Sequence, residues 1–255
     1  MARSKDRTEL IPKELYHELF VESIRNAEML IEEAKLIAES KSKTHARMLH
    51  NLAIEEVAKG YACLLVASGM IPRSHPLVRR TGKGCVFAGH DVKYGFYTAV
   101  AQKLFSKELQ KAKSGERSIF AGHEAEYLTL MATVQDLLSE AFQKKGTADR
   151  ELTRDEGILM QAKAAAFTGS QATKKRFEWM YVDAVKQTNG SWSVSSPLKL
   201  DSKDAGSQFQ LTELVIADVK SFESKSKAPE FDAFRQAYRK RAEQVDPTWP
   251  KNPIW

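Results

Sequence analysis

The sequence has few cysteines and no long uncharged apolar run, and each shortage excludes a class of protein. Cys63 and Cys85 are the only cysteines and form no CxxC pair, so we expect neither a disulfide framework nor a cysteine-ligated zinc site. The most apolar long segment, residues 46–67, contains charges and falls short of the ~18 uncharged residues that a membrane span needs. The N-terminal stretch MARSKDRTEL is polar and precedes no signal core. We therefore expect a cytoplasmic protein that does not enter a membrane.

The remaining composition is that of an ordinary globular protein. The 255 residues suffice for one large domain or two small ones, and a hydrophobic fraction of 42% allows a sizeable core. A net charge of +6 is compatible with a polyanionic partner without requiring one.

Residues 46–67 read ARMLHNLAIEEVAKGYACLLVA and have the composition of a helix that is packed on most of its circumference. Asn51, Glu55, Glu56 and Lys59 gather on one side of this helix. Glu55 and Lys59 are four residues apart with the acid first, which favours an ion pair between them. The group is either a solvated stripe on a core helix or a polar cluster between helices that orients other groups.

Apolar residues recur at helical spacing through most of the chain, for example Leu15, Leu19 and Ile24 in the first helix. The predicted helices span residues 12–40, 46–67, 91–113, 118–145, 153–166, 209–222 and 230–245.

A β-hairpin is predicted near residues 179–196, because Asn189-Gly190 is a strong turn signal between two strand-like runs. The fold class is therefore mainly α, a bundle of about seven helices with one hairpin. Residues 1–170 are expected to form the bundle. Residues 171–255, with the hairpin and the last helices, are expected to pack on the same domain, with the final segment docked through Trp249 and Trp255.

The connection over residues 69–89 differs from its surroundings, because it combines prolines and glycines with several basic side chains. It is either a flexible basic surface loop or a loop that contacts phosphate. Its basic residues are Arg73, Arg79, Arg80, Lys83 and the potentially charged His75.

Two stretches together resemble the AbiV-type abortive infection proteins, a branch of the HEPN superfamily. The first is AIEEVAKGYACLL at 53–65 followed by FAGHDVK at 87–93, and the second is RFEWMYVDAVKQTNGSWSVSSP at 176–197. The resemblance covers roughly residues 15–225. It rests on an EE-x-x-K helix, an H-x-x-K segment and a "YVD … G-x-W … P" hairpin in that order.

The resemblance implies a HEPN helical bundle in a bacterial cytoplasm and a role in antiviral shutdown of the host cell. It also implies RNA or the translation machinery as partner, a homodimer, and a phage-encoded activator protein. Many HEPN proteins are RNases that need no metal or other cofactor and carry an Arg-x4–6-His motif. This chain departs from that motif ahead of His90, because Lys83 stands where the motif has an arginine. A literal match occurs at Arg117 and His123.

Metal-independent cleavage of RNA needs a group that transfers protons and a positive charge near the phosphate. Histidine is suited to the proton transfer because its pKa lies near neutrality. In the sharper hypothesis the catalytic group comprises Glu55, Glu56, Lys59, His90 and Lys93. Glu55 fixes the His90 tautomer, while Lys59 and Lys93 meet the phosphate. In the alternative these side chains only satisfy one another. The predicted RNA-binding residues are Arg73, Arg79, Arg80, Lys83, Arg117 and His123.

Two other functions remain open on the sequence. The chain could be a non-catalytic module that binds protein or RNA through its basic loop. It could also be a carboxylate-bridged metal enzyme, because Glu14 and His17 have the Glu-x-x-His spacing of di-iron bundles. The sequence has no second Glu-x-x-His, so our site prediction includes no metal ligand.

Overall fold

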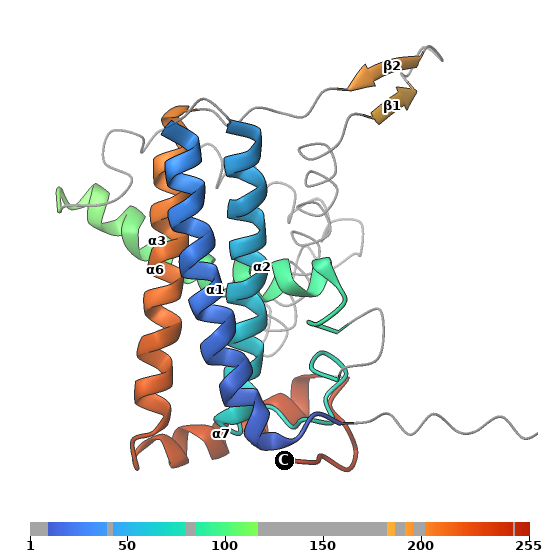
Figure 1. Ribbon diagram of the computed structural model, residues 1–255. Helices are drawn as coiled ribbons and strands as arrows, with labels where there is room; N and C mark the ends of the chain where they lie inside the picture. Colours follow the sequence, from blue (N-terminus) through green and yellow to red (C-terminus); the bar gives the residue numbers. More distant parts are fainter. Residues whose placement is uncertain are drawn as a thin grey trace, which may run out of the picture.

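The computed structural model describes residues 10–39, 43–79, 85–116, 183–186, 192–195, 202–246 and 248–255. It is mainly helical. Its helices are α1 (Lys13–Glu39), α2 (Lys43–Ala67), α3 (His90–Lys113), α6 (Ser202–Ser226) and α7 (Phe231–Val245). The long helices α1, α2 and α6 run side by side, α3 crosses behind them, and α7 lies across their lower end (Figure 1). The predicted helices 118–145 and 153–166 lie outside the described residues.

Helix α1 buries one face against the rest of the bundle, and the buried face differs slightly from the one predicted from the sequence. Tyr16, Phe20 and Ile24 are buried, whereas Leu15, expected to point inward, is 44% exposed. The stripe is shifted because the Tyr16 hydroxyl donates to the Val78 carbonyl oxygen at 3.2 Å and turns the first helical turn toward the loop after α2. One apolar core joins α1, α2, α3 and α6.

Helix α2 ends at a glycine because the chain reverses there. Gly69 has a φ of +70°, and the amides of Gly69 and Met70 donate back to the Val66 and Leu65 carbonyl oxygens. These two bonds form a Schellman motif, in which a glycine relieves the strain of the left-handed position. The chain therefore turns sharply under the end of the bundle.

Strands β1 (Asp183–Lys186) and β2 (Trp192–Ser195) pair antiparallel, with Asp183 opposite Ser195 and Lys186 opposite Trp192. They lie within the segment for which a hairpin was predicted. The turn signal Asn189-Gly190 lies outside the described residues, so the hairpin connection itself stays a prediction.

The C-terminal residues lie against the loop after α2. The rings of Trp249 and Trp255 are 5.8 Å apart, and the Arg239 guanidinium lies 3.7 Å from the centre of the Trp255 ring. The Ile254 amide donates to the Ser74 hydroxyl at 2.9 Å. Both tryptophans thus make the kind of contact expected from the sequence.

Among the described helices, none has the length and apolar character that crossing a membrane would need.

Candidate functional site

A buried carboxylate on α2 joins two side chains from the start of α3. Glu55 Oε1 lies 3.0 Å from His90 Nδ1, and Glu55 Oε2 lies 3.1 Å from Lys93 Nζ. The side chain of Glu55 is only 5% exposed. His90 and Lys93 are three residues apart on α3 and share a face, so one carboxylate can reach both. The structure therefore brings together three of the five predicted catalytic residues.

The geometry gives His90 a defined orientation. Because the carboxylate faces Nδ1, a neutral His90 holds its proton on Nδ1 and presents a lone pair on Nε2. Its side chain is 37% exposed, whereas that of Lys93 is 13% exposed. His90 is also the first residue of α3, where the positive end of the helix dipole favours anions. The arrangement can hold and move a proton at a position that solvent reaches.

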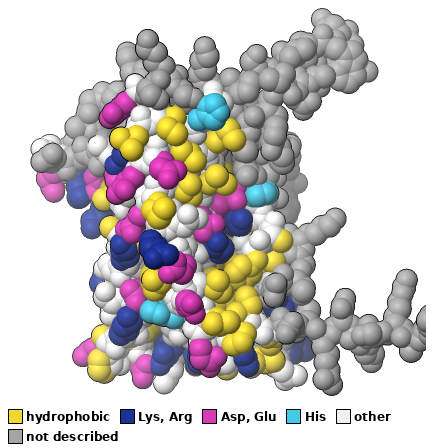
Figure 2. Space-filling view, in the orientation of Figure 1, with side chains coloured by type: hydrophobic (Ala, Val, Ile, Leu, Met, Phe, Trp, Pro, Cys, Tyr) yellow, Lys and Arg dark blue, Asp and Glu magenta, His cyan; other side chains and the backbone are white. Residues whose placement is uncertain are grey.

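The other two predicted residues belong to a different place, so the expected single cluster divides. Lys59 Nζ donates to Glu56, three residues before it, at 2.8 Å, whereas the helical spacing had favoured Glu55 as its partner. Adjacent residues on a helix point about 100° apart, so Glu56 faces α1 while Glu55 faces α3. Glu56 and Lys59 line a groove of about 400 Å³ with α1 residues that include Asn26 and Met29. Acidic and basic side chains intermingle on this face of the bundle (Figure 2).

The loop after α2 holds two of the predicted phosphate-binding residues. Arg73 and Arg79 are each partly exposed, and the Nε atom of each is covered without a hydrogen-bond acceptor. His75, counted with the basic residues, is instead 1% exposed and packs inside. The other four candidates, Arg80, Lys83, Arg117 and His123, lie outside the described residues.

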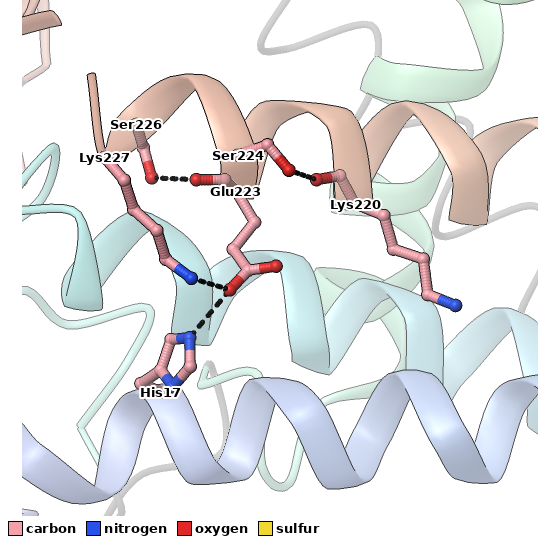
Figure 3. A network of polar contacts seen from close by, with 6 residues as sticks. All are labelled: His17, Lys220, Glu223, Ser224, Ser226 and Lys227. Atoms are coloured by element: carbon pink, nitrogen blue, oxygen red, sulfur yellow. Dashed lines mark hydrogen bonds and ion pairs between the residues drawn. The ribbon is translucent and has the colours of Figure 1, made fainter.

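The Glu-x-x-His spacing at Glu14 and His17 does not assemble a metal centre in the described part of the chain. His17 Nε2 contacts Glu223 on α6 at 2.9 Å, and Lys227 donates to the same carboxylate at 2.6 Å (Figure 3). Hydrogen bonds from Lys227 and His17 hold the pKa of Glu223 below its ordinary value. Glu14 is exposed, and no group of three His, Cys, Asp or Glu side chains suited to a metal occurs among the residues that the structure describes.

Comparison with known proteins identifies the family. The HEPN_AbiV family model, described as AbiV, matches residues 15–217. The chain belongs to the AbiV family. Membership suggests a role in abortive infection, a form of phage defence. Neither the comparison with curated proteins nor the comparison with solved structures found a match.

In this AbiV-family chain the match covers the helix with Glu55 and the segment with His90, so the candidate site lies inside the family region. The EE-x-x-K residues divide between the two faces of α2, with Glu55 on the His90 side and Glu56 and Lys59 on the α1 side. Adjacent glutamates in this AbiV chain therefore have different surroundings.

A second buried polar network in this AbiV-family protein was not predicted from the sequence. His50 Nε2 lies 2.9 Å from the Thr212 hydroxyl, which is also 2.7 Å from the Tyr97 hydroxyl. Burial, followed by the charge of Arg47, lowers the pKa of His50 to about 3. His50 is therefore neutral near pH 7. It lies on an apolar helix far in sequence from both hydroxyls, and only the packing of three helices reveals its partners.

Proposed function

We propose that this AbiV-family protein is an abortive-infection effector that cleaves RNA without a metal, with His90 as the proton-transfer group. The observation that carries the proposal is the contact between His90 Nδ1 and the buried carboxylate of Glu55. A buried carboxylate that orients a solvent-accessible imidazole is an arrangement suited to general acid–base catalysis.

In the proposed reaction the ribose 2′-hydroxyl attacks the neighbouring phosphorus. His90 Nε2 takes the hydroxyl proton as the new O–P bond forms. The bond to the 5′-oxygen then breaks, and that oxygen receives a proton from water, while His90 returns to the solvent the proton that it took. The products are a 2′,3′-cyclic phosphate and a 5′-hydroxyl, so atoms and electrons balance without a metal or an oxidant.

Each neighbour of His90 has a defined part in this proposal. Glu55 is a positioning residue, because it holds the tautomer and stabilises the imidazolium that forms. Lys93 balances the charge of Glu55 in a place that is largely shielded from water. The amino end of α3 favours the phosphate at the position of His90. These contacts support catalysis at this site rather than in the groove beside α1.

The test is incubation of the purified protein with total RNA in the presence of a chelator. We expect cleavage by the wild type, and a loss of about 100-fold or more in His90→Ala. His17→Ala is the matched control, because His17 also contacts a glutamate on another helix. It lies on α1, outside the proposed site. Glu55→Gln is expected to weaken cleavage and to change its pH profile. Wild-type rates in His90→Ala would refute the assignment.

A non-catalytic binding module is the second candidate, and the two arginines without acceptors at Nε favour it. RNA that stays intact yet shifts on a gel would support this function and exclude cleavage. The homodimer, the phage-encoded activator and the cytoplasmic location are predictions from the family resemblance. A monomeric mass at micromolar concentration would contradict the dimer.

A further inference from the structure

The loop formed by residues 68–79, which we call the anchored loop, is fixed at several points. The Arg235 guanidinium donates to the Ser68 carbonyl oxygen at 3.3 Å, and Arg239 Nε donates to the Gly69 carbonyl oxygen at 2.6 Å. The side chain of His75 donates from Nε2 to Asp246 Oδ2 at 2.9 Å. These contacts hold the backbone of the loop against α7 and the residue that follows it.

Two arginines of the anchored loop differ from other arginines in the contacts that they make within the described residues. Arg25 pairs with Glu22, and Arg235 pairs with Asp232. Within the described part of the chain, neither Arg73 nor Arg79 forms an ion pair with a carboxylate, and the Nε atom of each is covered without an acceptor.

An incompletely paired guanidinium that is partly removed from water is unfavourable, and a bound anion would offset the cost. Burial raises the pKa of the Tyr16 phenol to about 12, and the positive charge of Arg73 acts in the opposite direction. The Tyr16 hydroxyl is bonded to Val78, the residue before Arg79. Tyr16 therefore ties the Arg79 end of the anchored loop to α1.

The anchored loop is also connected to the segment that leads into His90. The Val86 amide donates to the Leu77 carbonyl oxygen at 2.7 Å. Leu77 lies two residues before Arg79, and Val86 lies four residues before His90. A backbone hydrogen bond therefore joins the anchored loop to the segment that leads into His90. Since the loop is held in place beforehand, little conformational entropy is lost when a ligand binds there.

We propose that Arg73 and Arg79 form a binding site for the phosphate groups of single-stranded RNA on the anchored loop. The guanidinium group suits this ligand, because its planar edge matches two oxygens of a phosphate. The choice of RNA as the source of the phosphates rests on the proposed function. The site itself rests on the incompletely paired guanidinium groups and the anchoring of the loop.

The experiment compares Arg73→Met/Arg79→Met with Arg25→Met, a control arginine that has a carboxylate partner on α1. The probe is a fluorescein-labelled 2′-O-methyl uridine oligonucleotide of about ten nucleotides. Its binding is followed by anisotropy at several salt concentrations. We expect affinity to fall about tenfold for each arginine lost, and the slope of log K against log salt to shrink by about 1.4. Unchanged affinity and slope in the double variant would overturn the proposal.

Melting temperature provides a second readout, so that a folding defect cannot be mistaken for lost binding. Replacing the two arginines by methionine is expected to keep or raise the Tm, because unpaired charges are removed and the apolar stems are kept. Arg239→Met, which loses a bond to Gly69 and the contact with Trp255, is expected to lower it. An equal fall in the double variant would mean that Arg73 and Arg79 stabilise the fold, against the proposal.

Inorganic phosphate, added alone, distinguishes the two sources of the anion. If the site takes a free anion, phosphate raises the Tm of the wild type but not of the double variant, and the oligonucleotide adds nothing. That result would overturn RNA as the ligand. We expect the oligonucleotide to raise the Tm of the wild type well beyond the effect of phosphate.

The 2′-O-methyl probe separates this inference from the proposed catalysis. It has no free 2′-hydroxyl, so it cannot be cut by the proposed reaction, and its binding does not depend on His90. Wild-type cleavage by His90→Ala would refute the catalytic proposal and leave the binding site standing. Undiminished probe binding by the double variant would refute the binding site and leave the catalytic proposal standing.

Discussion

His90 Nδ1 lies 3.0 Å from Glu55 Oε1, although the two residues are 35 positions apart in the sequence. Lys93 completes the contact from the same helix turn, at 3.1 Å from the other carboxylate oxygen. One buried negative charge thus holds α3 to α2 through two nitrogen atoms. The same contact serves stability and the proposed chemistry, so the two roles need separate tests.

Removing the Glu55 charge should destabilise the protein. Glu55→Gln leaves the largely buried Lys93 ammonium without its partner, and we expect a loss of about 2–3 kcal/mol in the free energy of unfolding. The measurement is urea denaturation. Glu56→Gln is the matched control, because its pair with Lys59 is more exposed and should be worth less than about 1 kcal/mol.

The double variant Glu55→Gln/Lys93→Met should recover most of that loss, since no unpaired charge remains. A coupling energy near zero between the two positions would contradict a direct interaction between Glu55 and Lys93.

Acid should weaken the fold through His50. Its pKa is about 3 in the folded protein and 6.5 for an ordinary histidine, so the unfolded chain binds the proton more readily. The stability of the folded state is therefore complete above about pH 6.5 and falls as the pH drops toward 3. At pH 5 the loss from this group is about 2 kcal/mol.

Urea denaturation of the wild type and of His50→Gln at pH 7 and pH 5 measures this effect. The variant is expected to be less stable at pH 7 because Thr212 loses a partner. Its stability should nevertheless change less between the two pH values than that of the wild type. An equal change in both proteins would show that other groups cause the acid sensitivity.

The sequence predicted the bounds of α1, α2, α3 and α7 to within three residues, because their apolar spacing is regular. It made α6 too short, since the helix runs over Ser202–Ser226 and not only over 209–222. The sharper hypothesis placed Glu55 against His90, as the structure does, but it assigned Lys93 to the phosphate, whereas Lys93 donates to Glu55. It did not predict that Glu56 and Lys59 form their own pair, because helical spacing allows Lys59 to reach either glutamate. The choice is made by α1 and α3, which cover opposite sides of α2. Long-range partners such as Thr212 for His50 have no signal in a single sequence.

The C-terminal residues should protect the anchored loop from opening. Asp246 accepts hydrogen bonds from His75 and from Thr248, whose amide lies 2.8 Å from it. Burial alone would raise the pKa of Asp246, but these bonds outweigh it and the pKa is lowered. Asp246→Ala should therefore release residues 74–79, seen as faster amide hydrogen exchange there and little change in α1. Unchanged exchange in the loop would show that Trp249 and Trp255 hold it without Asp246.

Gly69 is a position where any side chain should be costly, for two independent reasons. Its φ of +70° is strained for residues other than glycine, and a Cβ atom there would lie 2.5 Å from a terminal nitrogen of Arg239. We expect Gly69→Ala to lower the free energy of unfolding by about 1–2 kcal/mol for the backbone strain, with a further loss if Arg239 is displaced. Gly115, which also has a positive φ but has no atom of the described residues within 4 Å of its Cβ position, is the matched control.

The two contributions separate in the Arg239→Ala background, where the clash is absent and only the backbone strain remains. There Gly69→Ala should cost no more than Gly115→Ala, measured by urea denaturation of each variant. If Gly69→Ala lowers the free energy of unfolding equally with and without the Arg239 side chain, Arg239 makes no steric contact with the new methyl group. The contact between α7 and the end of α2 would then be looser than the hydrogen bond from Arg239 to the Gly69 carbonyl implies.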